Sequence, residues 1–296
     1  MSMKFFEGLM SYHFLQNALI TAVVIGIVSG AVGCFIILRS MSLMGDAISH
    51  AVLPGVALSF ILGVNFFIGA IIFGLLASVI ITYIKENSVI KGDTAIGITF
   101  SSFLALGVIL IGVANSSTDL FHILFGNILA VQDSDKWITI GVSIFVLVVI
   151  SLFFKELLLT SFDPILAKSM GVKVNAYHYL LMVLLTLVAV TAMQSVGTIL
   201  IVALLITPAA TAYLYANSLK VMLVMSSLLG ALASVLGLYL GYTFNVAAGS
   251  SIVLTSAMMF LISFFVSPKQ GYLKRWMQKK KKHLKLFALN TLVVCK

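Results

Sequence analysis

The sequence predicts an all-α integral membrane protein, a polytopic bundle of about eight or nine transmembrane helices. Hydrophobic residues make up 61% of the 296 residues and charged residues only 9%, whereas a soluble domain carries about 25% charged residues. Apolar runs long enough for a helix of about 20 residues recur along nearly the whole chain. A membrane barrel would instead show short segments of alternating polarity. Because lipid offers backbone groups no partners, the long runs indicate helices, which satisfy their hydrogen bonds internally.

The expected membrane segments follow one another closely and leave no room for a soluble domain. They are residues 14–38, 42–63, 66–85, 94–113, 137–157, 176–193, 197–216, 221–243 and 250–267. The segment 197–216 is short and contains Pro208, so a broken or re-entrant helix buried in protein is the alternative to a full crossing. That choice decides between eight and nine crossings. We expect one transmembrane domain over residues 1–268.

The net charge of +9 is concentrated in the basic tail, residues 269–296. This tail holds nine of the 18 basic residues and none of the acids, so the rest of the chain is neutral. The positive-inside rule predicts that the tail is cytoplasmic. It could also lie on anionic lipid, and nucleic-acid binding is the weakest of the three interpretations.

The remaining charges orient the bundle. If the tail is inside, the loops 39–41, 86–93, 163–175 and 217–220 are inside as well, and nine crossings put the N-terminus outside. The acidic loop 114–136 is then outside. Its apolar piece, residues 120–131, is too short to span the membrane and predicts an interfacial helix.

Asp46 lies well inside the second apolar segment and precedes His50 by four residues. The only other acid in a predicted segment, Glu156, is at the cytoplasmic end of 137–157. Residues i and i+4 are neighbours on one face of a helix. A carboxylate at the centre of a membrane helix costs about 2.5–3.5 kcal/mol, so this one must face the bundle interior or a wet cavity. A carboxylate oxygen and an imidazole nitrogen are ligands for a divalent transition metal. Pro54, on the same helix, is expected to kink it near the pair.

The same spacing has a purely structural alternative. Asp46 and His50 can bond one another, or a neighbouring helix, as a packing contact. Two ligands are also too few for a selective metal site. A second copy of the helix, or another segment, would have to complete it.

A short helix is predicted in the inside loop 161–177. Asp163 suits the N-cap, Pro164 the first helical position and Gly171 the C-terminal end. The helix is either a plain connector or a contact for a cytoplasmic partner. The chain has no G-x-x-x-x-G-K-[ST] phosphate loop and no H-E-x-x-H motif, so we expect neither ATP hydrolysis nor zinc-protease activity from it.

Three stretches resemble one known family. They are GCFIILRSMSLMGDAISHAVLPGVALSF (33–60), FDPILAKSMGV (162–172) and SVGTILIVALLITPAATA (195–212). Over residues 12–268 the chain is similar to the membrane permeases of ATP-binding-cassette importers for manganese, zinc and iron chelates. The resemblance implies a multi-pass protein of the bacterial plasma membrane. It also implies a paired second permease copy, a cytoplasmic ATPase subunit and an external metal-binding lipoprotein that delivers the ion.

By this resemblance, Asp46 and His50 match the pair that coordinates the transported metal, and no cofactor is permanently bound. The short cytoplasmic helix matches the coupling helix that seats in the ATPase. Its residues are Asp163, Pro164, Ile165, Leu166, Ala167, Lys168, Ser169, Met170 and Gly171. Asp119, Asp133 and Asp135 in the outside loop are either a docking site for the lipoprotein or ordinary solvated charges.

Manganese is the expected cargo. The stretch SHAVLPG is more similar to the manganese and iron branch than to the zinc branch. A pair without a thiolate avoids the soft ligands that favour Zn²⁺ and Cu⁺, although Zn²⁺ also takes His and Asp. Zinc or iron import by the same machinery is therefore the alternative. Further alternatives are a proton-coupled secondary transporter that uses Asp46 and His50, a membrane metalloenzyme, and an importer of a chelate or cobalamin-like ligand.

Overall fold

The computed structural model describes residues 2–113 and 128–267, and every regular element in these ranges is helical. The predicted all-α class is confirmed. The basic tail, Asp119 and most of the expected interfacial helix 120–131 lie outside the described residues.

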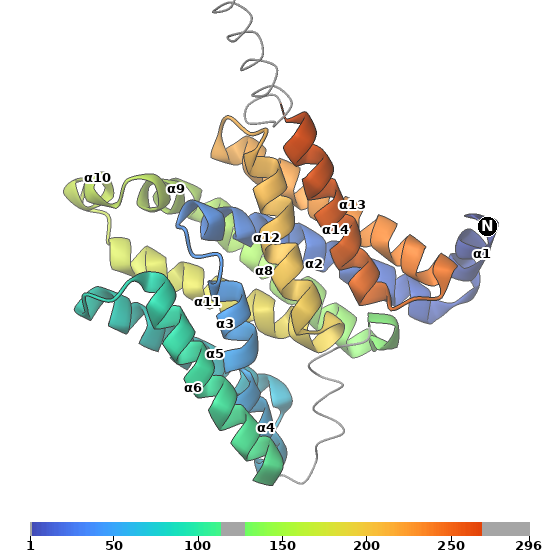
Figure 1. Cartoon of the computed structure of the whole chain (residues 1–296), viewed down its shortest axis with the longest axis horizontal. Helices are drawn as coiled ribbons and strands as arrows, with labels where there is room; N and C mark the ends of the chain where they lie inside the picture. The colour runs from blue at the N-terminus through green and yellow to red at the C-terminus, as the bar shows by residue number, and fades with distance from the viewer. Residues whose placement is uncertain (1, 114–127, 268–296) are drawn as a thin grey trace, which may run out of the picture.

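The helices follow the predicted segments closely (Figure 1). They are α1 (Ser2–Ser11), α2 (His13–Leu38), α3 (Met44–Ala51), α4 (Leu53–Leu62), α5 (Phe66–Asn87), α6 (Gly92–Val113), the 3-10 turn η1 (Ile128–Ala130), α8 (Asp133–Leu152), α9 (Phe154–Phe162), α10 (Pro164–Ser169), α11 (Val174–Val196), α12 (Thr198–Tyr213), α13 (Leu219–Phe244) and α14 (Ala248–Val266). In the described residues, eight spans are long and apolar enough to cross a membrane, and α3 with α4 forms one of them.

The segment 197–216, for which a broken or re-entrant helix was the alternative, forms one helix, α12, with Pro208 inside it. α12 follows α11 after the single residue Gly197, whose φ of +83° turns the chain back. Its last residue, Tyr213, lines a cavity with Leu38 and Phe162, at the opposite end of the bundle from Gly197. A helix of 16 residues is only about 24 Å long, which is short for a hydrocarbon core of about 30 Å. α12 packs against α2, α13 and α14, and it is shorter than the eight long apolar spans of the described residues.

Close helix packing in the bundle depends on small residues. α2 packs on α12 and α13, and both of these pack on α14. A Cβ at Gly26 of α2 would lie 2.5 Å from the carbonyl oxygen of Gly230 of α13. Ser226 of α13 donates to the Gly30 carbonyl of α2 at 2.8 Å. Such backbone-to-backbone approach is how membrane helices gain packing energy without a hydrophobic driving force. A second group, α3 to α6, joins the first mainly through α11 and α12.

The loops expected on the inside gather at one end of the bundle, called here the α10 end. One cavity there is lined from the ends of α2, α5, α9 and α11, and an adjoining one from α2, α5 and α6. At the other end, Asn17 of α2 donates to Asp133 of α8 at 3.1 Å, and Lys136 binds both. Asp135 accepts from Gln194 of α11 at 3.0 Å. The grouping of loops is therefore the one that the charges predict.

Candidate functional site

Asp46 and His50 lie on α3, in a span that is interrupted just after the pair. α3 ends at Ala51 and α4 begins at Leu53, with Pro54 in its first turn. Pro54 has no N–H to donate to the carbonyl of His50, four residues before it. The helix is interrupted directly after the pair, at the place where the kink is predicted.

The two side chains face one another. His50 Nε2 and Asp46 Oδ1 are 3.5 Å apart. Nitrogen and oxygen ligands lie about 2.1 Å from an ion such as Zn²⁺ or Mg²⁺, so two ligands of one ion in tetrahedral or octahedral geometry are about 3.0–3.4 Å apart. The observed separation is close to that needed to hold a single ion between the two atoms.

The surroundings of the pair are partly closed and partly open. α3 packs against α5, α6, α11 and α12, and the ring of Phe100 from α6 meets the His50 imidazole edge-on at 5.2 Å between centroids. His50 Nδ1 is buried without a hydrogen-bond partner among the described residues. The Asp46 side chain, in contrast, is 45% exposed. A charged side chain within a span does not face lipid without a large cost, so this face of α3 requires water or another protein chain.

Asp46 and His50 alone are too few ligands for a selective metal site. The described residues contain no group of three or more His, Cys, Asp or Glu side chains that could hold an ion. Asp46 and His50 are brought together as predicted, but no third protein ligand accompanies them within the described ranges. That a second copy of the helix, or another segment, completes the site stays a prediction.

The predicted short helix is present as α10. Asp163 Oδ1 accepts from the backbone N–H groups of Ile165 and Leu166 at 3.1 and 2.9 Å, and Gly171 has a φ of +81°. Ala167 faces inward, whereas Ile165 is 84% exposed and Met170 67% exposed. An apolar surface on a charged, solvent-side loop suggests a protein contact. Figure 1 shows α10 beside α9, projecting from the edge of the bundle.

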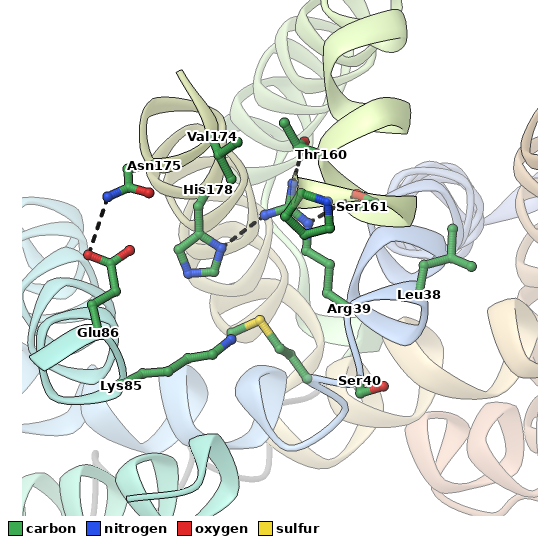
Figure 2. Close-up of a pocket in the computed structure, with 12 residues that line it drawn as sticks. Leu38, Arg39, Ser40, Lys85, Glu86, Thr160, Ser161, Val174, Asn175 and His178 are labelled. Atoms are coloured by element: carbon green, nitrogen blue, oxygen red, sulfur yellow. Dashed lines mark hydrogen bonds between the residues drawn. The ribbon is translucent and has the colours of Figure 1, made fainter. Parts of the chain in front are cut away.

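Sequence reasoning missed the role of Arg39, which it counted only as an inside charge. The guanidinium lies at the centre of a polar cluster at the α10 end (Figure 2). Nε donates to Ser161 at 3.0 Å and Nη2 to Thr160 at 2.9 Å, while Nη1 is 2.9 Å from His178 Nδ1. Burial lowers the pKa of Arg39 to about 10, so it stays protonated at neutral pH. The partners are more than 120 residues away along the chain, so no local sequence pattern predicts these contacts.

Comparisons with known proteins agree on one family. The ABC 3 transport family matches residues 11–267. The chain is 81% identical over 275 residues to the manganese import system permease protein ScaB of Streptococcus gordonii, covering 93% of this chain and 99% of that protein. It is 59% identical over 271 residues to the manganese transport system membrane protein MntC of Listeria monocytogenes, covering 92% and 97%. A solved structure, PsaBC from Streptococcus pneumoniae in complex with Fab, is 78% identical with a TM-score of 0.85, covering 93% of this chain and 99% of that one.

Proposed function

The chain belongs to the ABC 3 transport family, and we propose that it is the permease through which an ATP-driven importer moves Mn²⁺ into the cell. It is a multi-pass bacterial membrane protein with eight long apolar spans in its described residues. The manganese assignment is supported by the relatives at 81% and 59% identity, both of which are named as manganese permeases. Zinc or iron remains the alternative cargo for the same machinery.

The observation that carries the proposal is the arrangement of Asp46 and His50. A half-exposed carboxylate lies 3.5 Å from an imidazole within a membrane span, which is a costly arrangement for packing alone. A cation passing this point would exchange part of its water shell for a carboxylate oxygen and an imidazole nitrogen. Mn²⁺ binds ligands more weakly than the later divalent ions of its row, so a site without thiolate avoids favouring its soft competitors.

A second copy of the chain is the proposed source of the missing ligands. Most oligomers of identical chains are two-fold symmetric. If the open face of α3 lies on such an axis, two carboxylates and two imidazoles surround one path. The same contact would cover the 45% exposed Asp46 side chain, which removes its conflict with the lipid.

Energy is proposed to come from a separate ATPase subunit seated on α10. The chain has no phosphate-binding loop of its own, and the exposed Ile165, Leu166 and Met170 give α10 an apolar contact surface. An external metal-binding lipoprotein would deliver the ion to the opposite end. Capture outside and release inside require two conformations with different affinities for the ion, which ATP binding and hydrolysis by the partner would alternate.

The direct test is metal uptake into vesicles that contain the chain, its ATPase subunit and its lipoprotein. We expect ATP-dependent accumulation of radioactive Mn²⁺ that exceeds that of Zn²⁺ under the same conditions. Preferred transport of Zn²⁺ would overturn the manganese assignment. Uptake that needs no ATPase and follows an imposed proton gradient would overturn the importer and favour the proton-coupled alternative.

A charge placed on the exposed surface of α10 should weaken binding of the ATPase subunit without unfolding the permease. Ile165→Asp puts a charge on the most exposed apolar side chain of α10, so we expect the ATPase subunit to dissociate and uptake to fall about tenfold or more, the loss that 1.4 kcal/mol of contact energy produces. Co-purification of the ATPase with the tagged permease measures this directly.

The matched control is Val246→Asp, which adds the same charge to a 57% exposed valine at the other end of the bundle, where α13 ends. It should leave co-purification unchanged. If Ile165→Asp also retains the ATPase, α10 is a plain connector.

A further inference from the structure

Arg39 joins the two helices that flank α10 to the turn that leads into α3. Thr160 and Ser161 are near the end of α9, directly before the Asp163 cap of α10, and His178 is in the first turns of α11, directly after the loop that holds α10. The Arg39 guanidinium contacts all three side chains (Figure 2). The α10 loop is therefore attached to Arg39 on both of its sides.

Arg39 is followed in the chain by a hydrogen-bonded backbone turn that connects α2 to α3. The N–H of Ser40 donates to the Ile37 carbonyl and that of Met41 to the Ile36 carbonyl, each at 3.0 Å. This is the Schellman pattern, with Ser40 at the left-handed position and a φ of +53°. Met41 is 4% exposed, and its carbonyl accepts from the N–H of Met44, the first residue of α3, at 2.9 Å. The chain between Arg39 and the metal pair thus consists of hydrogen-bonded turns.

The cluster holds a half-buried cation through neutral hydrogen-bond partners. Within the described residues, no carboxylate forms an ion pair with Arg39. Glu86, which lines the same cavity, accepts instead from Asn175 of α11 at 3.5 Å. Lys85 of α5 lines the cavity as well. A charge held by two hydroxyls and an imidazole, without an ion pair, depends on the positions of α9 and α11 for its hydrogen bonds, so a shift of those helices changes its partners directly.

Direct contact between α10 and α3 is too slight to carry movement from one to the other. α10 packs on α9 and α11, whereas α3 packs on α4, α5, α6, α11 and α12. Movement of α10 therefore reaches α3 through α9 or α11, and Arg39 binds both. α11 also packs directly on α3, so loss of Arg39 should weaken the link rather than abolish it.

We propose that Arg39 is a positioning residue for transport, which passes movement of the α9–α10–α11 loop to the α2–α3 turn and so to Asp46 and His50. The inference rests on the proposed function. In this arrangement the ATPase subunit moves α10, the Thr160, Ser161 and His178 contacts move the guanidinium, and the rigid turn moves the start of α3. A change in the separation of the metal ligands then alters how tightly the ion is held.

The test measures Mn²⁺ imported per ATP hydrolysed, in liposomes that contain the complete importer. Arg39→Gln should retain the ATPase subunit and hydrolyse ATP, but import about fivefold less Mn²⁺ per ATP, a size typical of coupling between two sites. Arg39→Lys keeps the charge but cannot reach three partners at once. Its Mn²⁺ imported per ATP should therefore lie between the values of the wild type and of Arg39→Gln. A merely structural role would lower import and hydrolysis together and leave the ratio unchanged.

A second variant protects the test against misfolding. Thr160→Val with Ser161→Ala removes two of the three partners and leaves Arg39 in place, and it should lower the same ratio. Lys155→Gln, an exposed cation on α9, is the matched control and should keep the wild-type ratio. A wild-type ratio in both the Arg39→Gln and the double variant would overturn the inference. If the wild-type importer moves no Mn²⁺ with ATP, the proposed function itself fails.

Discussion

Asp46→Asn and His50→Ala are each expected to lower ATP-dependent Mn²⁺ uptake by roughly 100-fold, because loss of even an outer-shell partner of a metal ligand costs about 10–100-fold. Asparagine keeps the size of the aspartate but removes its charge, so it tests the electrostatic part of ion binding. Alanine at position 50 removes the imidazole whose Nε2 lies 3.5 Å from Asp46 Oδ1. If two copies pair, each substitution removes two ligands at once.

For each variant, both Mn²⁺ uptake and assembly with the ATPase subunit must be measured, alongside matched control variants. Each variant should be recovered with its ATPase subunit, which shows that the bundle is folded. Asp93→Asn removes an exposed carboxylate at the start of α6, and His13→Ala an exposed imidazole at the start of α2. Both controls should transport normally. Normal uptake by Asp46→Asn and His50→Ala, with assembly intact, would make the pair a packing contact.

Much of the fold could be predicted because membrane insertion is decided locally. The long apolar runs fix the spans within a few residues, Pro54 fixes the interruption after α3, and Asp163 with Gly171 fixes α10. Some boundaries were wrong for an equally local reason. The segment predicted to begin at 137 begins at Asp133, because carboxylates in the first turn favour the positive end of the helix.

The remaining features depend on residues far apart in the chain. That Asp46 and His50 share a face follows from their spacing, but the 45% exposure of Asp46 depends on which helices pack around α3. The Arg39 cluster joins residues 121 to 139 positions apart, and a single sequence holds no periodic signal for such contacts. The same is true of the glycines, whose number suggests close packing but not which of them touch a neighbouring backbone.

Replacing a glycine by alanine is expected to destabilise the protein at one position and to stabilise it at another. Gly33 of α2 faces α12 so closely that a Cβ would overlap the carbonyl oxygen of Leu205 and lie 3.2 Å from the Cβ of Ala209. Gly33→Ala must therefore push two central helices apart, and overpacking of this kind costs about 1–3 kcal/mol or more. Gly141 of α8 has nothing within 4 Å of its Cβ position. Gly141→Ala should instead stabilise its helix by about 0.5–1 kcal/mol.

Thermal unfolding of the detergent-purified protein measures both effects. Gly33→Ala should lower the Tm by roughly 5–10 °C or prevent recovery of folded protein, and Gly141→Ala should raise the Tm by about 2 °C, since 1 kcal/mol shifts the Tm of a chain of 150–250 residues by about 2–4 °C. The substitution is chemically identical in the two variants, so helix propensity cancels in the comparison. The difference between them then reports the contact between α2 and α12. Equal Tm values would mean that these two helices have room to separate, and that the close packing of α2 is not what holds the bundle together.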